Sequence, residues 1–137
     1  MPPIKTINVF GDRVDVFVDS ATSNGASSAI LHYAPPGGGP PPHSHTNEDE
    51  TFTVIEGEFE ILSDGKWHPL AKGEIAYGPR GNTHTFRNSG KTPGILAIFI
   101  APGGFENYLE EISQYSPITG LVKILEISKR YGIKFQL

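Results

Sequence analysis

Two histidines separated by a single residue, His43 and His45, stand near the middle of the first hundred residues. Alternate residues of an extended chain point to the same side, so this spacing lets both imidazoles chelate one metal ion. Glu50 follows five residues after His45, and His84 opens a strand much later in the chain. Three imidazoles and one carboxylate suit one divalent transition metal (Fe, Mn, Ni, Cu, Co or Zn) and leave positions for water or substrate. These residue types predict an open metal site.

The histidine spacing also has an ordinary explanation, because a His-x-His pair is often two loop histidines that bind nothing. The carboxylate ligand also has alternatives, because Glu48 and Asp49 directly precede Glu50 in the sequence. Glu50 is favoured because Phe52 and Val54 share its face of the strand, which makes that face the inward one. Acids are rarely buried, so we expect Glu48 and Asp49 to lie in a solvated loop.

The elements that must position these residues are those of one mainly β domain. A chain of 137 residues can bury one core, and its 16 Gly and 12 Pro are typical of short strands joined by turns. Short apolar or alternating segments predict nine strands before residue 102, which suggests a sandwich or barrel. The predicted strands are Ile4–Phe10, Arg13–Val18, Ser27–Ala34, Thr51–Ile55, Phe59–Leu62, Trp67–Leu70, Glu74–Tyr77, His84–Asn88 and Ile95–Ala101.

Composition excludes several classes of chemistry. Without Cys there are no disulfides, thiolate nucleophiles, iron–sulfur clusters or cysteine zinc sites. A net charge of −4 without long basic runs disfavours nucleic acid as a partner. No apolar stretch approaches the roughly 18 residues of a membrane span, and the N-terminus lacks a signal pattern. We therefore expect a soluble, cytoplasmic protein with no membrane partner.

Helical spacing replaces the strand pattern after residue 104. The first apolar face comprises Phe105, Tyr108, Leu109 and Ile112. A second helix is expected to open at Ser116 or Pro117 and to close near Gly132. Its predicted apolar face comprises Ile118, Leu121, Val122 and Leu125. We expect both helices to pack on the outside of the preceding β structure.

Glycines and a proline stand at regular distances around the histidines, and together these residues resemble the two sequence motifs of the cupins. The first motif, G-x5-H-x-H-x3or4-E-x6-G, is matched by Gly37, His43, His45, Glu50 and Gly57. The second, G-x5-P-x-G-x2-H-x3-N, is matched by Gly73, Pro79, Gly81, His84 and Asn88. The resemblance implies a jelly-roll β-barrel, over residues 1–103, with a helical C-terminal extension over residues 104–137. It also implies a metal held by His43, His45, Glu50 and His84.

The alternation of side chains along the strands predicts which residues line the pocket. Phe86 and Asn88 would point inward with His84, and Phe52 and Val54 with Glu50. Tyr77 is a further candidate, although alternation does not carry across the turn before His84. Such walls are apolar and partly aromatic, as in many small-molecule sites. The predicted substrate pocket therefore comprises Phe52, Val54, Tyr77 and Phe86. For any single aromatic, ordinary core is the preferred interpretation, and His32 and His68 are expected to be structural or surface residues.

Within the cupins, the chain looks most like quercetin dioxygenase-like members, on the segments Gly37–His45, Asp49–Phe52 and Ala101–Glu106. This resemblance implies oxidation of a small aromatic or enolic substrate, with Glu50 as ligand and general base. Two alternatives stay open: a non-catalytic binding or sensing barrel, and a metal-dependent isomerase or decarboxylase. An isomerase or decarboxylase would need Lys or Arg in the cavity to bind a carboxylate. Strand alternation instead points Arg87 outward if His84 points inward. Val16, Val18 and Ile55, taken as exposed on edge strands, would suit a homodimer, as is common in the family.

Overall fold

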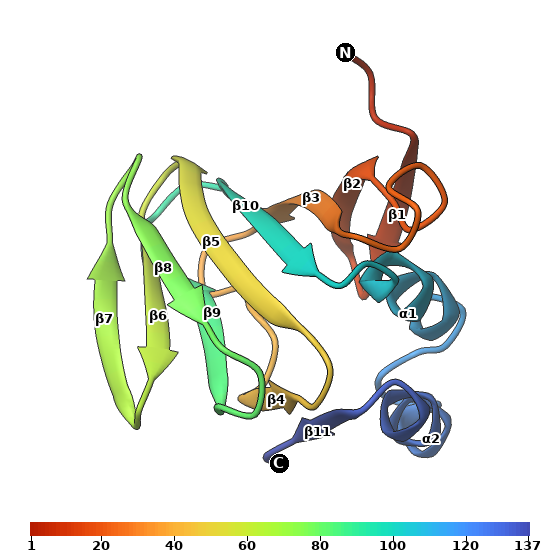
Figure 1. The fold of residues 1–137 in the computed structure, drawn as a ribbon. Helices are drawn as coiled ribbons and strands as arrows, with labels where there is room; N and C mark the ends of the chain where they lie inside the picture. Colours follow the sequence, from red (N-terminus) through yellow and green to blue (C-terminus); the bar gives the residue numbers. More distant parts are fainter.

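The computed structural model describes all of residues 1–137 and consists of two antiparallel sheets that face each other, with two helices at one side (Figure 1). The six-stranded sheet has the order β1 (Lys5–Val9), β2 (Asp12–Val18), β3 (Ser28–Ala34), β10 (Gly94–Ala101), β5 (Asp49–Glu56), β8 (Ile75–Gly78). The five-stranded sheet has the order β11 (Ile133–Phe135), β4 (His43–His45), β9 (His84–Asn88), β6 (Phe59–Ser63), β7 (Lys66–Leu70). The mainly β, jelly-roll prediction is confirmed, although β4 and β11 were not among the predicted strands.

The core lies between the two sheets because the inward positions of their strands are apolar. Along β5 the inward side chains are Glu50, Phe52 and Val54, which are all buried. Phe59 and Phe86 face them from the opposite sheet. The ring of Phe86 lies about equally close to the rings of Phe52 and Phe59. A polar Glu50 therefore continues a row of core residues, at the end of the strand nearest β4.

Tight hairpins join β1 to β2 and β6 to β7. Asp64 and Gly65 both have positive φ between β6 and β7, as expected for this dipeptide. Phe10 and Gly11 do the same between β1 and β2, at φ 54° and 96°. A positive φ is unusual for an aromatic residue, and here Asn8 Oδ1 supports the turn by accepting a hydrogen bond from the Gly11 backbone at 3.0 Å. This turn holds Phe10 and the start of β2 in place.

The C-terminal segment is more closely built into the fold than predicted. Helix α1 (Phe105–Ile112) contacts β1, and α2 (Leu121–Arg130) leads into β11 (Figure 1). Strand β11 pairs with β4, with Ile133 opposite His45 and Phe135 opposite His43. The extension therefore completes one sheet in addition to packing two helices beside it.

The apolar face predicted for the second helix is wrong. Residues 117–119 form a turn, and α2 begins only after Gly120. The residues that α2 buries are Ile124, Ile127 and Ser128. The residues predicted to be buried are exposed, namely Ile118, Leu121, Val122 and Leu125. This buried face is joined to α1 by a hydrogen bond of 2.7 Å between the hydroxyls of Tyr108 and Ser128.

The exposed strand face proposed for dimer formation is also partly wrong. Strand β2 has neighbours on both sides, and Val16 is fully buried in the core. Val18 is half-buried, and only Ile55 is well exposed. The edges of the six-stranded sheet are β1 and β8.

Neither helix has the length and apolar composition needed to cross a bilayer.

Candidate metal centre and adjoining cavity

Four potential metal ligands converge between the sheets. Strand β4 supplies His43 and His45, β5 supplies Glu50, and β9 supplies His84 directly opposite His43. One ligand atom from each residue lies within 4.8 Å of the others, and all four residues are buried. Three strands from both sheets thus place the predicted residues together.

Hydrogen bonds at the back of two imidazoles decide which nitrogen faces the cluster. His43 Nδ1 donates to the Pro41 carbonyl at 2.9 Å, and His45 Nδ1 lies 3.1 Å from Glu48 Oε2. With protons on these nitrogens, each Nε2 keeps a lone pair directed away from the hydrogen bond. Both rings are therefore fixed in a tautomer suited to metal binding.

The expectation that Glu48 lies in a solvated loop is wrong. Its exposed fraction is 8%, because the turn between β4 and β5 folds its carboxylate back onto the ring of His45. Asp49 is half-buried and binds Arg80 at 3.0 Å through the guanidinium and at 2.9 Å through the backbone amide. The three-residue step from His45 to Glu48 is the sequence signal that could have identified this contact.

The polar atoms at the centre of the cluster have no hydrogen-bond partner, although they are buried. They are His45 Nε2, Glu50 Oε2 and both ring nitrogens of His84. His84 Nε2 lies only 2.7 Å from Glu50 Oε2, and His45 Nε2 lies 3.4 Å from it, yet neither contact has hydrogen-bond geometry. Unpaired buried polar groups are costly, and a cation in the cluster would pair with His45 Nε2, Glu50 Oε2 and His84 Nε2 at once, whereas His84 Nδ1, on the other side of the ring, would not reach it. The donor set therefore fits a single metal ion.

Burial and mutual charge set the protonation of the cluster. Burial lowers the pKa of His43 to about 4. Burial also acts to lower the pKa of His45, but the hydrogen bond to Glu48 and the charge of Glu50 outweigh it and the net pKa is raised. For Glu50, burial acts to raise the pKa, but contact with His84 and the nearby imidazoles keeps it below its usual value. Glu50 is thus an anion, and His43 is neutral at neutral pH.

Backbone contacts hold His84 against the cluster. The Gly81 amide, in the turn before His84, donates to the His45 carbonyl at 2.7 Å. A Cβ at Gly78 would lie 2.7 Å from His84 Nδ1, so only glycine leaves room for the ring. At the far end of β9, Asn88 Nδ2 donates to the carbonyls of Ala34 and Thr92, as expected for a residue that ties down the end of the strand.

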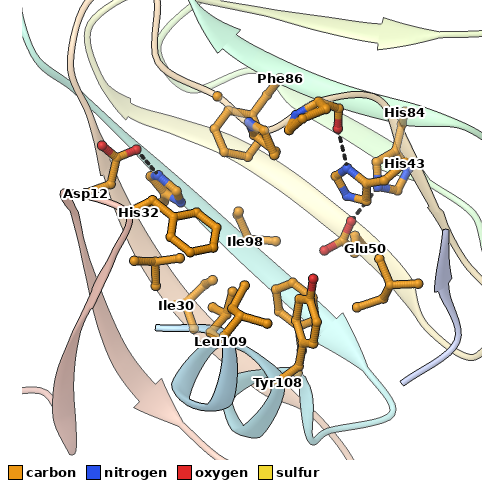
Figure 2. Close-up of a pocket in the computed structure, with 18 of the residues that line it drawn as sticks. Asp12, Ile30, His32, His43, Glu50, His84, Phe86, Ile98, Tyr108 and Leu109 are labelled. Carbon is orange, nitrogen blue, oxygen red and sulfur yellow. Dashed lines mark hydrogen bonds and ion pairs between the residues drawn. The ribbon is translucent and has the colours of Figure 1, made fainter. Parts of the chain in front are cut away.

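A cavity of about 320 Å³ adjoins the cluster (Figure 2). Phe52 and Phe86 line it, whereas Val54 is buried but does not reach it. The prediction for Tyr77 is wrong, because this residue is 59% exposed. The pairing of β5 with β8 explains this: Glu50 lies opposite Gly78 on the inward side, so Tyr77 faces outward.

Sequence reasoning missed several walls of the cavity. The C-terminal segment contributes Phe105, Tyr108, Leu109, Ile112, Ile133 and Phe135. Their helical or strand periodicity identifies apolar faces but not what those faces cover. The histidine outside the cluster that lines the cavity is His32, whereas His68 is exposed on β7. Arg87 points outward as predicted, over the ring of Trp67 at 3.8 Å and 2.9 Å from Glu60.

The family model described as "Cupin domain" matches residues 30–100, which is just over half of the chain. The chain belongs to the cupin family. An uncharacterized protein of Aquifex aeolicus is 40% identical over 57 residues, which cover 42% of this chain and 47% of that protein. The chain spans less than half the length of each curated relative it matches.

Solved cupin-like structures agree with this fold. KdgF from a Halomonas species superposes with a TM-score of 0.63 at 18% identity, covering 71% of this chain and 84% of that one. A predicted oxalate decarboxylase from Thermotoga maritima superposes with a TM-score of 0.61 at 25% identity, covering 74% and 93%.

The four candidate metal ligands lie within the segment matched by the cupin model, whereas many residues of the cavity wall lie outside it. All four cluster residues lie inside residues 30–100, but nine of the 21 residues that line the cavity lie outside it. These nine come from the β1–β2 hairpin and the C-terminal segment. The cupin core therefore supplies the cluster, and the flanking elements supply much of the pocket.

Proposed function

We propose that this cupin is a metal-dependent dioxygenase whose substrate is a small, uncharged aromatic or enolic compound. The observation that carries the proposal is the composition of the cavity beside the metal cluster. Its walls are mostly aliphatic and aromatic, and no Lys or Arg lines it. A decarboxylase or isomerase of small organic acids would gain from a cation that binds the carboxylate, so the walls favour an apolar substrate.

Each residue of the cluster has a defined part in this proposal. His43, His45, His84 and Glu50 would hold one divalent transition metal. When bound, that metal acidifies a coordinated hydroxyl and supports electron transfer from substrate to dioxygen. Phe52 and Phe86 would contact the aromatic ring from the cavity wall and keep water from it.

Glu50 is the proposed proton acceptor. Its Oε2 faces the histidines, while Oε1 forms no hydrogen bond within the protein and belongs to a residue that lines the cavity. Oε1 would accept the proton of the substrate hydroxyl. Both atoms of dioxygen would enter the product and the substrate would supply the electrons, so that no separate reductant is needed.

Elemental analysis of purified protein, followed by oxygen-uptake measurements, tests this function. Protein loaded in turn with Fe, Mn, Ni, Cu, Co or Zn is offered a panel of flavonols, catechols and cyclic enols. We expect uptake of one dioxygen per substrate with at least one redox-active metal, and its loss in Glu50→Gln but not in His68→Ala. Tight binding of these compounds without oxygen uptake by any metal form would overturn the dioxygenase and favour a binding or sensing cupin.

A further inference from the structure

The cavity has a second polar group, remote from the metal cluster. His32 of β3 and Asp12 at the start of β2 both line it, with His32 Nε2 at 2.8 Å from Asp12 Oδ2. Figure 2 shows this pair at one side of the pocket and Glu50, His43 and His84 at the other. The side chains of His32 and Asp12 are 14% and 21% exposed, against 3% to 4% for His84 and Glu50. The pair therefore lies at the end of the cavity nearer to solvent.

Asp12 fixes the tautomer of His32. A carboxylate can only accept, so His32 Nε2 carries the proton of their hydrogen bond. The ring of Phe86 meets the imidazole edge-on, with ring centres 5.2 Å apart, and restrains its orientation. With one proton on Nε2, Nδ1 keeps a lone pair, and it has no hydrogen-bond partner within the protein. Apolar Val9, Phe10 and Ile30 line the same cavity and offer no side-chain hydrogen bond, so a hydrogen-bond donor that enters it can pair with Nδ1.

We propose that His32 recognises a hydroxyl group of the substrate, at the end remote from the oxygens that bind the metal. The inference rests on the proposed function and narrows its substrate class to aromatic or enolic chelators with a further hydroxyl group. Asp12 is a positioning residue that holds Nδ1 toward the cavity. A cavity of about 150 Å³ accommodates benzene. The volume here, about 320 Å³, is therefore suited to a molecule of about two six-membered rings.

A pair of probes that differ by one hydroxyl tests this inference. The probes are 3,4-dihydroxybiphenyl and 3,4,4′-trihydroxybiphenyl, which share a catechol to bind the metal. Their dissociation constants are measured by calorimetry on the Zn-loaded protein, in which no turnover occurs. We expect the trihydroxy probe to bind about threefold to tenfold more tightly, the effect of one neutral hydrogen bond.

Variants of His32 assign the preference to its Nδ1. His32→Phe should abolish the preference while it leaves binding of the dihydroxy probe within about twofold, because the apolar wall is kept. His32→Gln, which retains an acceptor, should restore part of the preference, and His68→Phe should leave it unchanged. Thermal melting of each variant confirms that it is folded.

The outcomes separate the two proposals. If both probes bind the wild-type protein equally and only when metal is present, or if His32→Phe keeps the preference, the role of His32 is overturned while the metal-centred function stands. If neither probe binds the Zn-loaded protein, the proposed function fails, and the inference fails with it.

Discussion

Glu48 Oε2 lies 3.1 Å from Nδ1 of His45, and this contact fixes which nitrogen of a candidate ligand faces the metal centre. Carboxylates behind metal-bound imidazoles raise ligand basicity, and their loss typically weakens metal affinity by about tenfold to a hundredfold. We expect Glu48→Gln to weaken Ni²⁺ or Zn²⁺ binding within this range, measured by competition with a chromophoric chelator. Asp49→Asn, which alters the neighbouring acid, is the matched control. Equal affinity of Glu48→Gln and wild type would contradict this role.

Removal of two ligands should abolish metal retention without unfolding the protein. The variant is His43→Ala combined with His84→Ala, and metal content after dialysis is the measurement. We expect less than about a tenth of an equivalent of metal, because only one imidazole and one carboxylate remain. Circular dichroism should retain the wild-type β signal. Stoichiometric metal in this variant would show that the assigned ligands are wrong.

Metal affinity should fall in mild acid, and the residue that controls the fall is His45. An imidazole binds metal only when neutral. The pKa of His45 is raised and that of His43 is lowered to about 4, so protons compete first at His45 as the pH decreases. Below the pKa of His45, affinity should decrease by about tenfold per pH unit. In Glu48→Gln the carboxylate that raises this pKa is absent, so the onset of the decrease should move to lower pH. An unchanged onset would refute the assignment.

Glu106 should be important for stability and for the shape of the pocket. It is 1% exposed, accepts a hydrogen bond from the Ser28 hydroxyl, and accepts another from the Gly104 amide at 3.1 Å. A buried acceptor of this kind contributes about 1.5–3 kcal/mol per charged hydrogen bond. We expect Glu106→Ala to lower the free energy of unfolding by about 3 kcal/mol in urea titrations.

Exposed Glu110 on the same helix provides the control for that measurement. Its contact with Lys5 is an ion pair at the surface, so Glu110→Ala should cost less than about 1 kcal/mol. Similar losses for the two variants would show that the Glu106 contacts are unimportant. Because Glu106 anchors the start of α1, its loss should also disturb Phe105 and Tyr108 in the cavity wall.

Much of the site could be predicted from the sequence because it depends on local geometry. The two-residue step from His43 to His45 and the alternation from Glu50 to Phe52 determine which side chains point inward. Tyr77 shows the limit of this reasoning: its orientation depends on its register against β5, which the turn at Pro79 hides from sequence periodicity. The error at Glu48 has a different cause, because base rates of burial cannot identify the single acid that has a hydrogen-bond partner.

The C-terminal segment shows why the remaining features could not be predicted. Two helices were expected from the spacing of apolar residues, but the three-residue strand β11 is too short to show a period. The buried face of α2 includes the hydroxyl pair of Tyr108 and Ser128, which is a tertiary contact between residues 20 positions apart. Pocket walls that come from distant segments of the chain can be identified only once the fold is known.

The separation between ligand-bearing strands and flanking walls has an evolutionary consequence. Substitutions in the β1–β2 hairpin or after residue 100 alter what the cavity admits while the metal ligands stay untouched. A duplicated gene could thus come to bind a different small molecule through substitutions in its terminal segments, one side chain at a time. The cluster of His43, His45, Glu50 and His84 would remain intact at every intermediate step.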